Sequence, residues 1–184
     1  MNTAVAKQLD DYSIEDIYNL PDGQRAELID GELYMMATPG RVHQELVTDF
    51  TYFIKDYIKN KKGECRVYPA PFAVFLNANN EIYLEPDISV VCDKNKITEK
   101  GCNGAPDWVI EIVSPSSRSM DYAKKLFKYR TAGVREYWII DYGRSRITVY
   151  NFEQEEMTEY MFSDKVNASI FEDLEIDFSE IDIE

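Results

Sequence analysis

Two carboxylates in this chain lie among apolar residues, where an unpaired charge is costly. Asp87 precedes one strand-like apolar run, and Glu111 lies inside Trp108-Val109-Ile110-Glu111-Ile112-Val113. An ionised carboxylate removed from water needs a cation or hydrogen-bond donors to offset its lost hydration. Lys125, on a later segment, is a candidate for such a cation. Two acids and one ammonium are also the groups that metal-dependent hydrolysis of a phosphodiester bond requires.

Asp87 and Glu111 would share a divalent metal ion if their strands were neighbours. Without a cation, carboxylates at close range repel each other, and one of them takes up a proton. Magnesium suits such a pair, because it prefers oxygen ligands and keeps several waters, so that two carboxylates and a substrate phosphate suffice. The ion activates water and neutralises charge on the phosphate. We therefore predict Asp87 and Glu111 as ligands of Mg²⁺ or Mn²⁺.

The segment after residues 114–117, whose hydroxyl groups can cap a helix, is predicted to be helical until Gly133. Its apolar positions define the inward side of the helix, and they are Tyr122, Leu126, Tyr129 and Gly133. At about 100° per residue, Lys125 lies roughly 60° from the centre of this side, whereas Lys124 and Lys128 point further away. We therefore predict that Lys125 faces the site and acts on the attacking water or on the phosphate.

Each of these residues also has a purely structural interpretation. Asp87 would be a turn residue after Pro86, and Lys125 would extend along an apolar flank of its helix. Glu111 would form a buried ion pair with Arg118 or Arg130. The sequence leaves these alternatives open.

Several further elements are predicted to position the site. Ser13 and Asp16 indicate a short helix, which Pro21 ends. Asp30-Gly31 favours the turn of a β-hairpin, because both residues accept positive φ angles. Apolar residues at three- and four-residue spacing predict a long helix from Val42 until Gly63.

The region from Arg66 to Val113 is rich in β-branched and aromatic residues and is predicted to form strands of one sheet. Alternation along 108–113 places Glu111 on the same side as the valines and opposite Trp108. Residues 136–141 form a further predicted strand, and a turn at 143–145 leads into a strand at 147–150. The pattern predicts a mixed α/β (α+β) fold.

Composition indicates a single domain. The 184 residues include 45% hydrophobic residues, enough for a substantial core. Cys65, Cys92 and Cys102 form no Cys-x-x-Cys motif, and their odd number argues against a disulfide framework, so we expect a reducing, cytoplasmic setting. We find no signal sequence and no apolar run of the roughly 20 residues needed to cross a bilayer, so no membrane association is expected.

The net charge of −14 is unevenly distributed. Residues 151–184 hold 12 acidic residues and one basic residue, whereas residues 1–150 hold 22 acidic and 19 basic residues. We interpret the acidic segment as a solvated face in preference to a DNA-mimicking or autoinhibitory element. The charge nevertheless weighs against nucleic acid binding, which normally depends on clustered Lys and Arg.

The order and spacing of these motifs resemble the PD-(D/E)XK nuclease superfamily and, within it, the Uma2 family of restriction-endonuclease-like proteins. The matching stretches are Glu27 to Leu33, Gly40 with His43, Glu85-Pro86-Asp87, Glu111 to Ser116, Asp121 with Lys125 and Tyr129, and Gly133 to Trp138. The resemblance implies one restriction-endonuclease-like domain, residues 1–184, with its core at about 25–150 and an acidic segment at 151–184. It implies a mixed β-sheet flanked by helices, an N-terminal hairpin and a C-terminal β extension.

The resemblance also assigns roles to residues. It implies that Asp87 and Glu111 are metal ligands and that Glu27 is a supporting ligand beside them. The superfamily lysine normally stands two residues after the acid, but Val113 occupies that position here, and Lys125 on the next helix takes its place. His43 could face the same pocket, and Asp121 and Tyr129 accompany Lys125.

The sequence therefore predicts a metal-dependent endonuclease that cleaves DNA and pairs its sites in a homodimer. The alternative is a catalytically inactive binding or regulatory module that keeps the fold, which the acidic net charge favours.

Overall fold

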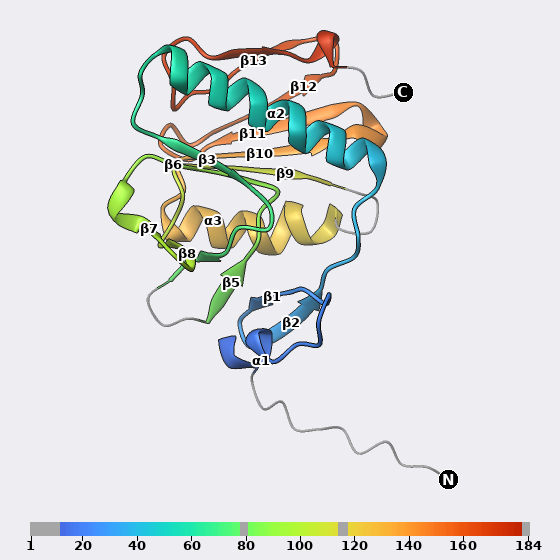
Figure 1. Cartoon of the computed structure of the whole chain (residues 1–184). Helices are drawn as coiled ribbons and strands as arrows, with labels where there is room; N and C mark the ends of the chain where they lie inside the picture. Colours follow the sequence, from blue (N-terminus) through green and yellow to red (C-terminus); the bar gives the residue numbers. More distant parts are fainter. Residues whose placement is uncertain (1–11, 78–80, 114–117, 182–184) are drawn as a thin grey trace.

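The computed structural model describes residues 12–77, 81–113 and 118–181, which form a layered α+β structure (Figure 1). The central sheet contains, in spatial order, β12 (Glu156–Met161), β11 (Arg146–Asn151), β10 (Glu136–Asp141), β9 (Trp108–Ile112), β6 (Ile88–Val91) and β3 (Arg66–Pro69). The second sheet contains β2 (Glu32–Met35), β1 (Ala26–Ile29), β5 (Ile82–Leu84), β4 (Val74–Phe75), β8 (Gly101–Asn103) and β7 (Ile97–Thr98). A small pair, β13 (Lys165–Asn167) and β14 (Glu175–Asp177), lies near the C-terminus.

Helices separate and cover these sheets. The principal helices are α1 (Ile14–Tyr18), α2 (Arg41–Asn60) and α3 (Leu126–Ala132), and α3 continues a π-helix, η2 (Met120–Lys125). Short 3₁₀ turns occur at η1 (Lys94–Lys96), η3 (Tyr142–Arg144) and η4 (Phe178–Glu180). Figure 1 shows α2 on one side of the central sheet and α3 on the other, between the central sheet and the second sheet.

Alternation along the strands divides the core into layers. Trp108, Ile110 and Ile112 of β9 join α2 and the C-terminal strands in one buried cluster. Val109 joins α3 and the inner side of the second sheet in another, on the opposite face. A third, smaller cluster lies between the outer side of the second sheet and α1. Glu111 therefore points to the α3 side of the central sheet, as predicted.

Most predicted elements are confirmed. The Asp30-Gly31 turn has positive φ at both residues and joins β1 to β2. The long helix runs from Arg41 to Asn60, and α3 ends at Gly133 with φ 93°. The proposed helix cap at residues 114–117 lies outside the described residues.

Two predictions are wrong. The strands between Arg66 and Val113 do not form one sheet, because β3, β6 and β9 belong to the central sheet while β4, β5, β7 and β8 belong to the second sheet. The argument against disulfides from the odd number of cysteines fails as well, since Cys65 and Cys92 form a disulfide. The antiparallel pairing of β3 with β6 brings these residues together at the ends of the two strands, although they are 27 positions apart in sequence.

Within the described residues, no helix is both long and apolar enough to span a membrane.

Candidate active site

The antiparallel pairing of β6 with β9 brings Asp87 beside Glu111. Ile88 is opposite Ile110 in this ladder, and Asp87 directly precedes Ile88, so it lies next to Glu111. The Asp87 N–H group is 3.4 Å from Glu111 Oε2, and the Ile112 N–H group donates to Asp87 Oδ2 at 2.7 Å. The two acids are therefore neighbours at the edge where β6 begins and β9 ends, as the sequence suggested.

Lys125 of the π-helix lies at the centre of a group of carboxylates. Its Nζ atom is 2.9 Å from Glu27 Oε2, 3.0 Å from Glu111 Oε1 and 3.5 Å from Asp121 Oδ1. Lys125 is 5% exposed, and Glu27 and Glu111 are 4% exposed. Three segments distant in sequence, namely β1, β9 and η2, thus meet at one buried ammonium.

The remaining predicted site residues also join this group. The Tyr129 hydroxyl donates to Glu111 Oε1 at 2.8 Å, although Tyr129 is a core residue as well. His43, in the first turn of α2, places Nε2 3.2 Å from Asp87 Oδ2. Its other ring nitrogen, Nδ1, is buried without a hydrogen-bond partner among the described residues.

The pKa shifts in this group follow from burial and from the charges of its neighbours. Burial raises the pKa of Glu111 well above its usual value; Lys125 opposes this rise, and Asp121, Asp87 and Glu27 add to it. Burial lowers the pKa of Lys125, but the carboxylates of Glu111, Glu27 and Asp121 outweigh it and raise that pKa overall. Lys125 is therefore charged. The carboxylate groups around it outnumber this single positive charge.

His43 has a raised pKa for a related reason. Burial alone would lower it, but the hydrogen bond to Asp87 and the negative charge of that residue outweigh the burial. The protonated imidazole is thus stabilised beside Asp87.

The two arginines considered as alternative partners of Glu111 pair with other acids. Arg118 pairs with Asp141 through contacts of 2.6 and 2.8 Å, and Arg130 lies 3.7 Å from Glu155. Neither arginine is the partner of Glu111, which instead contacts Lys125 and Tyr129.

The other two lysines of this helical segment behave as predicted. Lys124 is exposed and pairs with Glu32, while Lys128 pairs with Asp30, so both contact the β1–β2 hairpin at the surface.

Two supporting residues were not assigned from sequence. The Glu85 N–H group donates to Glu27 Oε1 at 3.1 Å, and the Tyr137 hydroxyl donates to the carbonyl of Asp121 at 3.2 Å. A signal for Tyr137 was present, because strand alternation puts it on the same side of β10 as Ile139, which pairs with Glu111 in the parallel register. Glu85 had no comparable signal, since its role depends on the pairing of β1 with β5.

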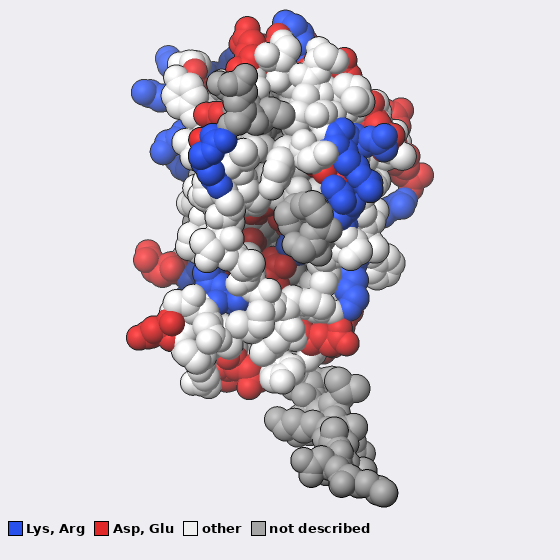
Figure 2. All heavy atoms as spheres, turned by 90° about the vertical axis from the view of Figure 1, so that its right-hand side faces the viewer, with Lys and Arg blue, Asp and Glu red and all other residues white. Residues whose placement is uncertain are grey.

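The site opens on the side of the molecule where β9 ends and α2 begins. Figure 2 shows a hollow in this face with Asp or Glu atoms at its base and Lys or Arg side chains on its rim. Acidic groups thus lie inside the hollow, and cationic groups lie at some places around it, among residues of other types.

The donor set is compatible with a hard divalent cation. Among the described residues, no three His, Cys, Asp or Glu side chains converge into a ready-made metal cluster. The buried acids nevertheless outnumber the one buried cationic side chain of the described residues, Lys125. The pKa of Glu111 is raised mainly by burial, and the negative charges of Asp121, Asp87 and Glu27 add to the rise. Carboxylate oxygens are the ligands that Mg²⁺ prefers, so Asp87 and Glu111 fit such an ion chemically.

Comparison with solved structures places the architecture in the class of nuclease-like α+β folds. A protein from Anabaena variabilis, described as "a putative nuclease belonging to DUF820", superposes with a TM-score of 0.75 and 22% identity. The match covers 92% of this chain and 96% of that chain. At this identity the likeness concerns the fold alone.

The chain belongs to the Uma2 family, described as "Putative restriction endonuclease", whose model matches residues 12–183. Two uncharacterized proteins of Synechocystis sp. are also similar. One is 25% identical over 130 residues, covering 69% of this chain and 72% of the relative, and the other is 22% identical over 129 residues, covering 70% and 66%. Family membership supports a nuclease-like function.

Proposed function

We propose that this protein is a Mg²⁺- or Mn²⁺-dependent endonuclease that hydrolyses phosphodiester bonds of DNA. The observation that carries the proposal is that Asp87 and Glu111 are neighbours across adjacent strands, with the Asp87 N–H group 3.4 Å from Glu111 Oε2, beside the buried ammonium of Lys125. Membership of the Uma2 family supports the nuclease class, while the metal and the DNA substrate are the finer part of the proposal.

Asp87 and Glu111 would hold the metal ion. Glu111 Oε1 accepts hydrogen bonds from Lys125 and Tyr129, which leaves Oε2 facing Asp87. Asp87 Oδ2 accepts from Ile112 and lies near His43, while Oδ1 has no donor among the described residues. When bound, a divalent ion supplies a water of lowered pKa and positive charge beside the phosphate.

Lys125 would act on the attacking water or on the phosphate, and its neighbours are positioning residues. Glu27 and Asp121 both contact the ammonium, and Tyr129 donates a hydrogen bond to the Glu111 oxygen that Lys125 contacts. A cation held in advance at the place where negative charge develops needs no reorganisation during the reaction. His43 would keep Asp87 oriented in the same way.

Digestion of single- and double-stranded DNA across a titration of Mg²⁺ and Mn²⁺ tests this proposal. We expect cleavage by the wild type and a loss of at least about 100-fold in Glu111→Gln and Asp87→Asn, a typical effect of removing one electrostatic stabiliser. Glu64→Gln is the matched control, because its side chain is 83% exposed and far from the acids in the fold. Equal cleavage by the wild type and Glu111→Gln contradicts the proposal.

A catalytically inactive binding or regulatory module is the second candidate. The net charge of −14 and the missing ready-made metal cluster among the described residues favour it. Calorimetric titration with Mn²⁺ separates the two functions, because a nuclease requires metal at Asp87 and Glu111 whereas an inactive module does not. Homodimerisation and a cytoplasmic location stay predictions.

A further inference from the structure

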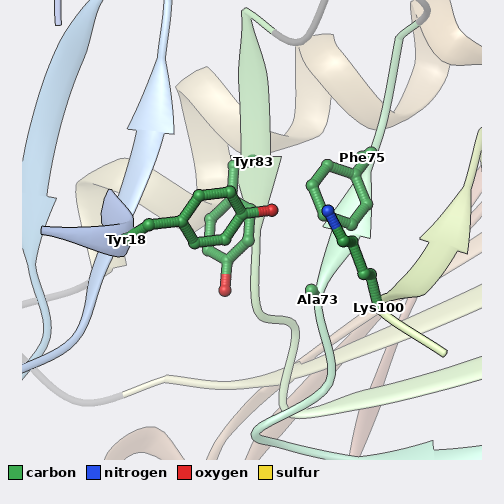
Figure 3. A pocket seen from close by; sticks show the side chains of 5 residues that line it. All are labelled: Tyr18, Ala73, Phe75, Tyr83 and Lys100. Carbon is green, nitrogen blue, oxygen red and sulfur yellow. The ribbon is translucent and has the colours of Figure 1, made fainter. Parts of the chain in front are cut away.

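A pocket of about 400 Å³ lies on the side of the second sheet that carries α1, away from Lys125 (Figure 3). Its lining residues are Tyr18, Ala73, Phe75, Tyr83 and Lys100. Tyr18 comes from the end of α1, Phe75 and Tyr83 from the paired strands β4 and β5, and Lys100 from the turn between β7 and β8. The volume falls in the range of roughly 300 to 1,000 Å³ that small-molecule sites occupy.

Aromatic rings form most of the wall of this pocket. Phe75 and Tyr83 are 8% and 7% exposed, and their ring centroids are 5.6 Å apart in an edge-to-face arrangement. Tyr18 is 55% exposed. Figure 3 shows Tyr18 and Tyr83 on one side of the pocket and Phe75 with Lys100 on the other. Rings arranged in this way suit a planar ligand, since aromatic side chains stack on π-systems such as nucleobases.

Lys100 adds a positive charge at the rim. Its Nζ atom lies 5.8 Å from the centroid of the Tyr18 ring. Lysine ion pairs among the described residues are made by Lys61, Lys94, Lys124, Lys125, Lys128 and Lys165, and not by Lys100. Because Lys100 is exposed and has no acidic partner among the described residues, its ammonium is available to bind an anion. The pocket therefore combines surfaces for a flat ring with one cation for a negatively charged group.

We propose that this pocket binds a nucleoside phosphate, with the base against the rings of Tyr18, Phe75 and Tyr83 and the phosphate at Lys100. An inorganic anion would use the lysine but not the rings, and an uncharged apolar ligand would use the rings but not the lysine. A free nucleotide and an unstacked nucleotide of a nucleic acid strand present the same two groups.

The choice of a nucleotide rests on the proposed nuclease function, which makes nucleic acid the substrate. The pocket is also connected to the candidate active site. The Tyr83 hydroxyl donates to Glu85 Oε1 at 2.6 Å, the Glu85 N–H group donates to Glu27 Oε1, and Glu27 Oε2 contacts Lys125. Glu85 thus contacts both Tyr83 in the pocket wall and Glu27, the residue that contacts Lys125.

Calorimetric titrations in the presence of EDTA test the proposal with four probes, namely dAMP, deoxyadenosine, inorganic phosphate and a short single-stranded oligonucleotide. We expect the wild type to bind dAMP more tightly than deoxyadenosine or phosphate. Tyr18→Ala should weaken dAMP binding by about tenfold or more, the usual loss for one stacking ring, and Lys100→Gln should weaken it several-fold. The matched controls are Tyr52→Ala, at 64% exposure, and the exposed Lys55→Gln, both on α2, and they should leave binding unchanged.

The proposal is overturned if Tyr18→Ala and Lys100→Gln bind dAMP and the oligonucleotide as tightly as the wild type does. It is also overturned if the wild type binds neither of these two probes. If the pocket variants lose affinity only for the oligonucleotide, the pocket binds a nucleotide of a nucleic acid strand. If they lose affinity for dAMP, the pocket binds a free nucleotide. Because EDTA removes metal, the titrations do not depend on cleavage. A protein that binds dAMP but never cuts DNA contradicts only the proposed function, and one that cuts DNA but ignores all four probes contradicts only this inference.

Discussion

The ammonium of Lys125 offsets the free-energy cost of burying the carboxylates beside it. Its ammonium contacts Glu27, Glu111 and Asp121, and within the described residues it is the one cationic side chain that is buried. Removing one partner from a buried ion pair leaves the other charge uncompensated, which costs more than the pair itself contributes. The same side chain therefore has a structural role and a proposed chemical role.

Lys125→Met should lower the free energy of unfolding by about 3 to 5 kcal/mol at neutral pH, because the three buried carboxylates of Glu27, Glu111 and Asp121 lose their cation. The loss should shrink at acidic pH, where Glu111 is protonated and needs no cation. Chemical denaturation at pH 5 and pH 8 measures both effects. Lys124→Met is the control, since Lys124 is exposed, and a similar loss in both variants would contradict the assignment.

Glu136 is a second buried acid, outside the candidate active site. It is 0% exposed, Trp138 donates to its Oε1 atom at 2.5 Å, and the Ile170 N–H group donates to its Oε2 atom at 2.9 Å. Burial raises its pKa to about 7, although these hydrogen bonds oppose the rise. Glu136 thus connects β10 to the C-terminal segment through a group that titrates near neutral pH.

The raised pKa of Glu136 makes stability depend on pH in a defined direction. Between pH 4.5 and about 7 the folded state keeps the proton that the unfolded state has already released, so its stabilising effect is complete below pH 4.5 and is lost as pH rises through 7. The difference amounts to about 3 kcal/mol. We expect the free energy of unfolding of the wild type, relative to Glu136→Gln, to fall by this order between pH 4.5 and 8. Parallel stability curves for the two proteins would be the contrary result.

The β1–β2 hairpin carries Glu27 to the π-helix. Lys124 contacts Glu32 and Lys128 contacts Asp30, while Glu27 and Lys125 form a buried pair between the same two elements. The turn at Asp30 and Gly31 fixes the register that directs Glu27 inward. Exposed ion pairs contribute little stability, whereas breaking the buried Glu27–Lys125 contact would leave a buried charge uncompensated.

Gly101 allows β8 to approach β4 closely. Its φ is +138°, and a Cβ atom there would lie 2.2 Å from the carbonyl oxygen of Ala73. Gly101→Ala should therefore cost roughly 3 kcal/mol or more, from backbone strain and overpacking together. Gly104→Ala, at φ +96° with no atom within 4 Å of the added carbon, should cost about 1 kcal/mol from strain alone. Thermal unfolding compares the two, and equal effects would contradict this explanation.

The sequence predicted those elements that repeat a pattern over several turns or residues. Spacing along the helical segment separated Lys125 from Lys124 and Lys128, and alternation in β9 placed Glu111 correctly. The strands β4, β7 and β8 have only two or three residues, too few to show which sheet they join. The π-helix was not predicted either, since its residues have the same apolar spacing as an α-helix.

Contacts between distant segments were the least predictable part of the site. Glu27 was assigned through a family resemblance, and nothing in its local sequence indicated that it contacts Lys125. The pairing of Arg118 with Asp141 excluded one alternative partner of Glu111, yet both arginines were reasonable candidates from sequence. Burial and pairing of charges depend on the assembled fold, whereas periodicity is a local property.

The acidic C-terminal segment is an integral part of the molecule. Val166, Leu174, Ile176 and Phe178 are buried against α2 and the central sheet. Acidic residues between them, such as Glu172 and Glu175, are exposed. The interpretation of a solvated acidic face therefore agrees with the structure, and that face also covers one side of the core.

The disulfide between Cys65 and Cys92 predicts a simple thiol count. Protein purified without reductant and then unfolded should show one reactive thiol, from the buried Cys102, and three after reduction. Titration with a thiol reagent in denaturant measures this. Three reactive thiols before reduction would show that the two cysteines are unpaired in solution.

Diffraction from a crystal soaked in Mn²⁺ most directly tests whether the paired acids form a metal centre. Anomalous density identifies manganese independently of any assay for cleavage. We expect a peak within coordination distance of carboxylate oxygens from both Asp87 and Glu111, and its disappearance in Glu111→Gln crystals. A saturated crystal with no peak between these two residues, or with the same peak in the variant, would contradict the account.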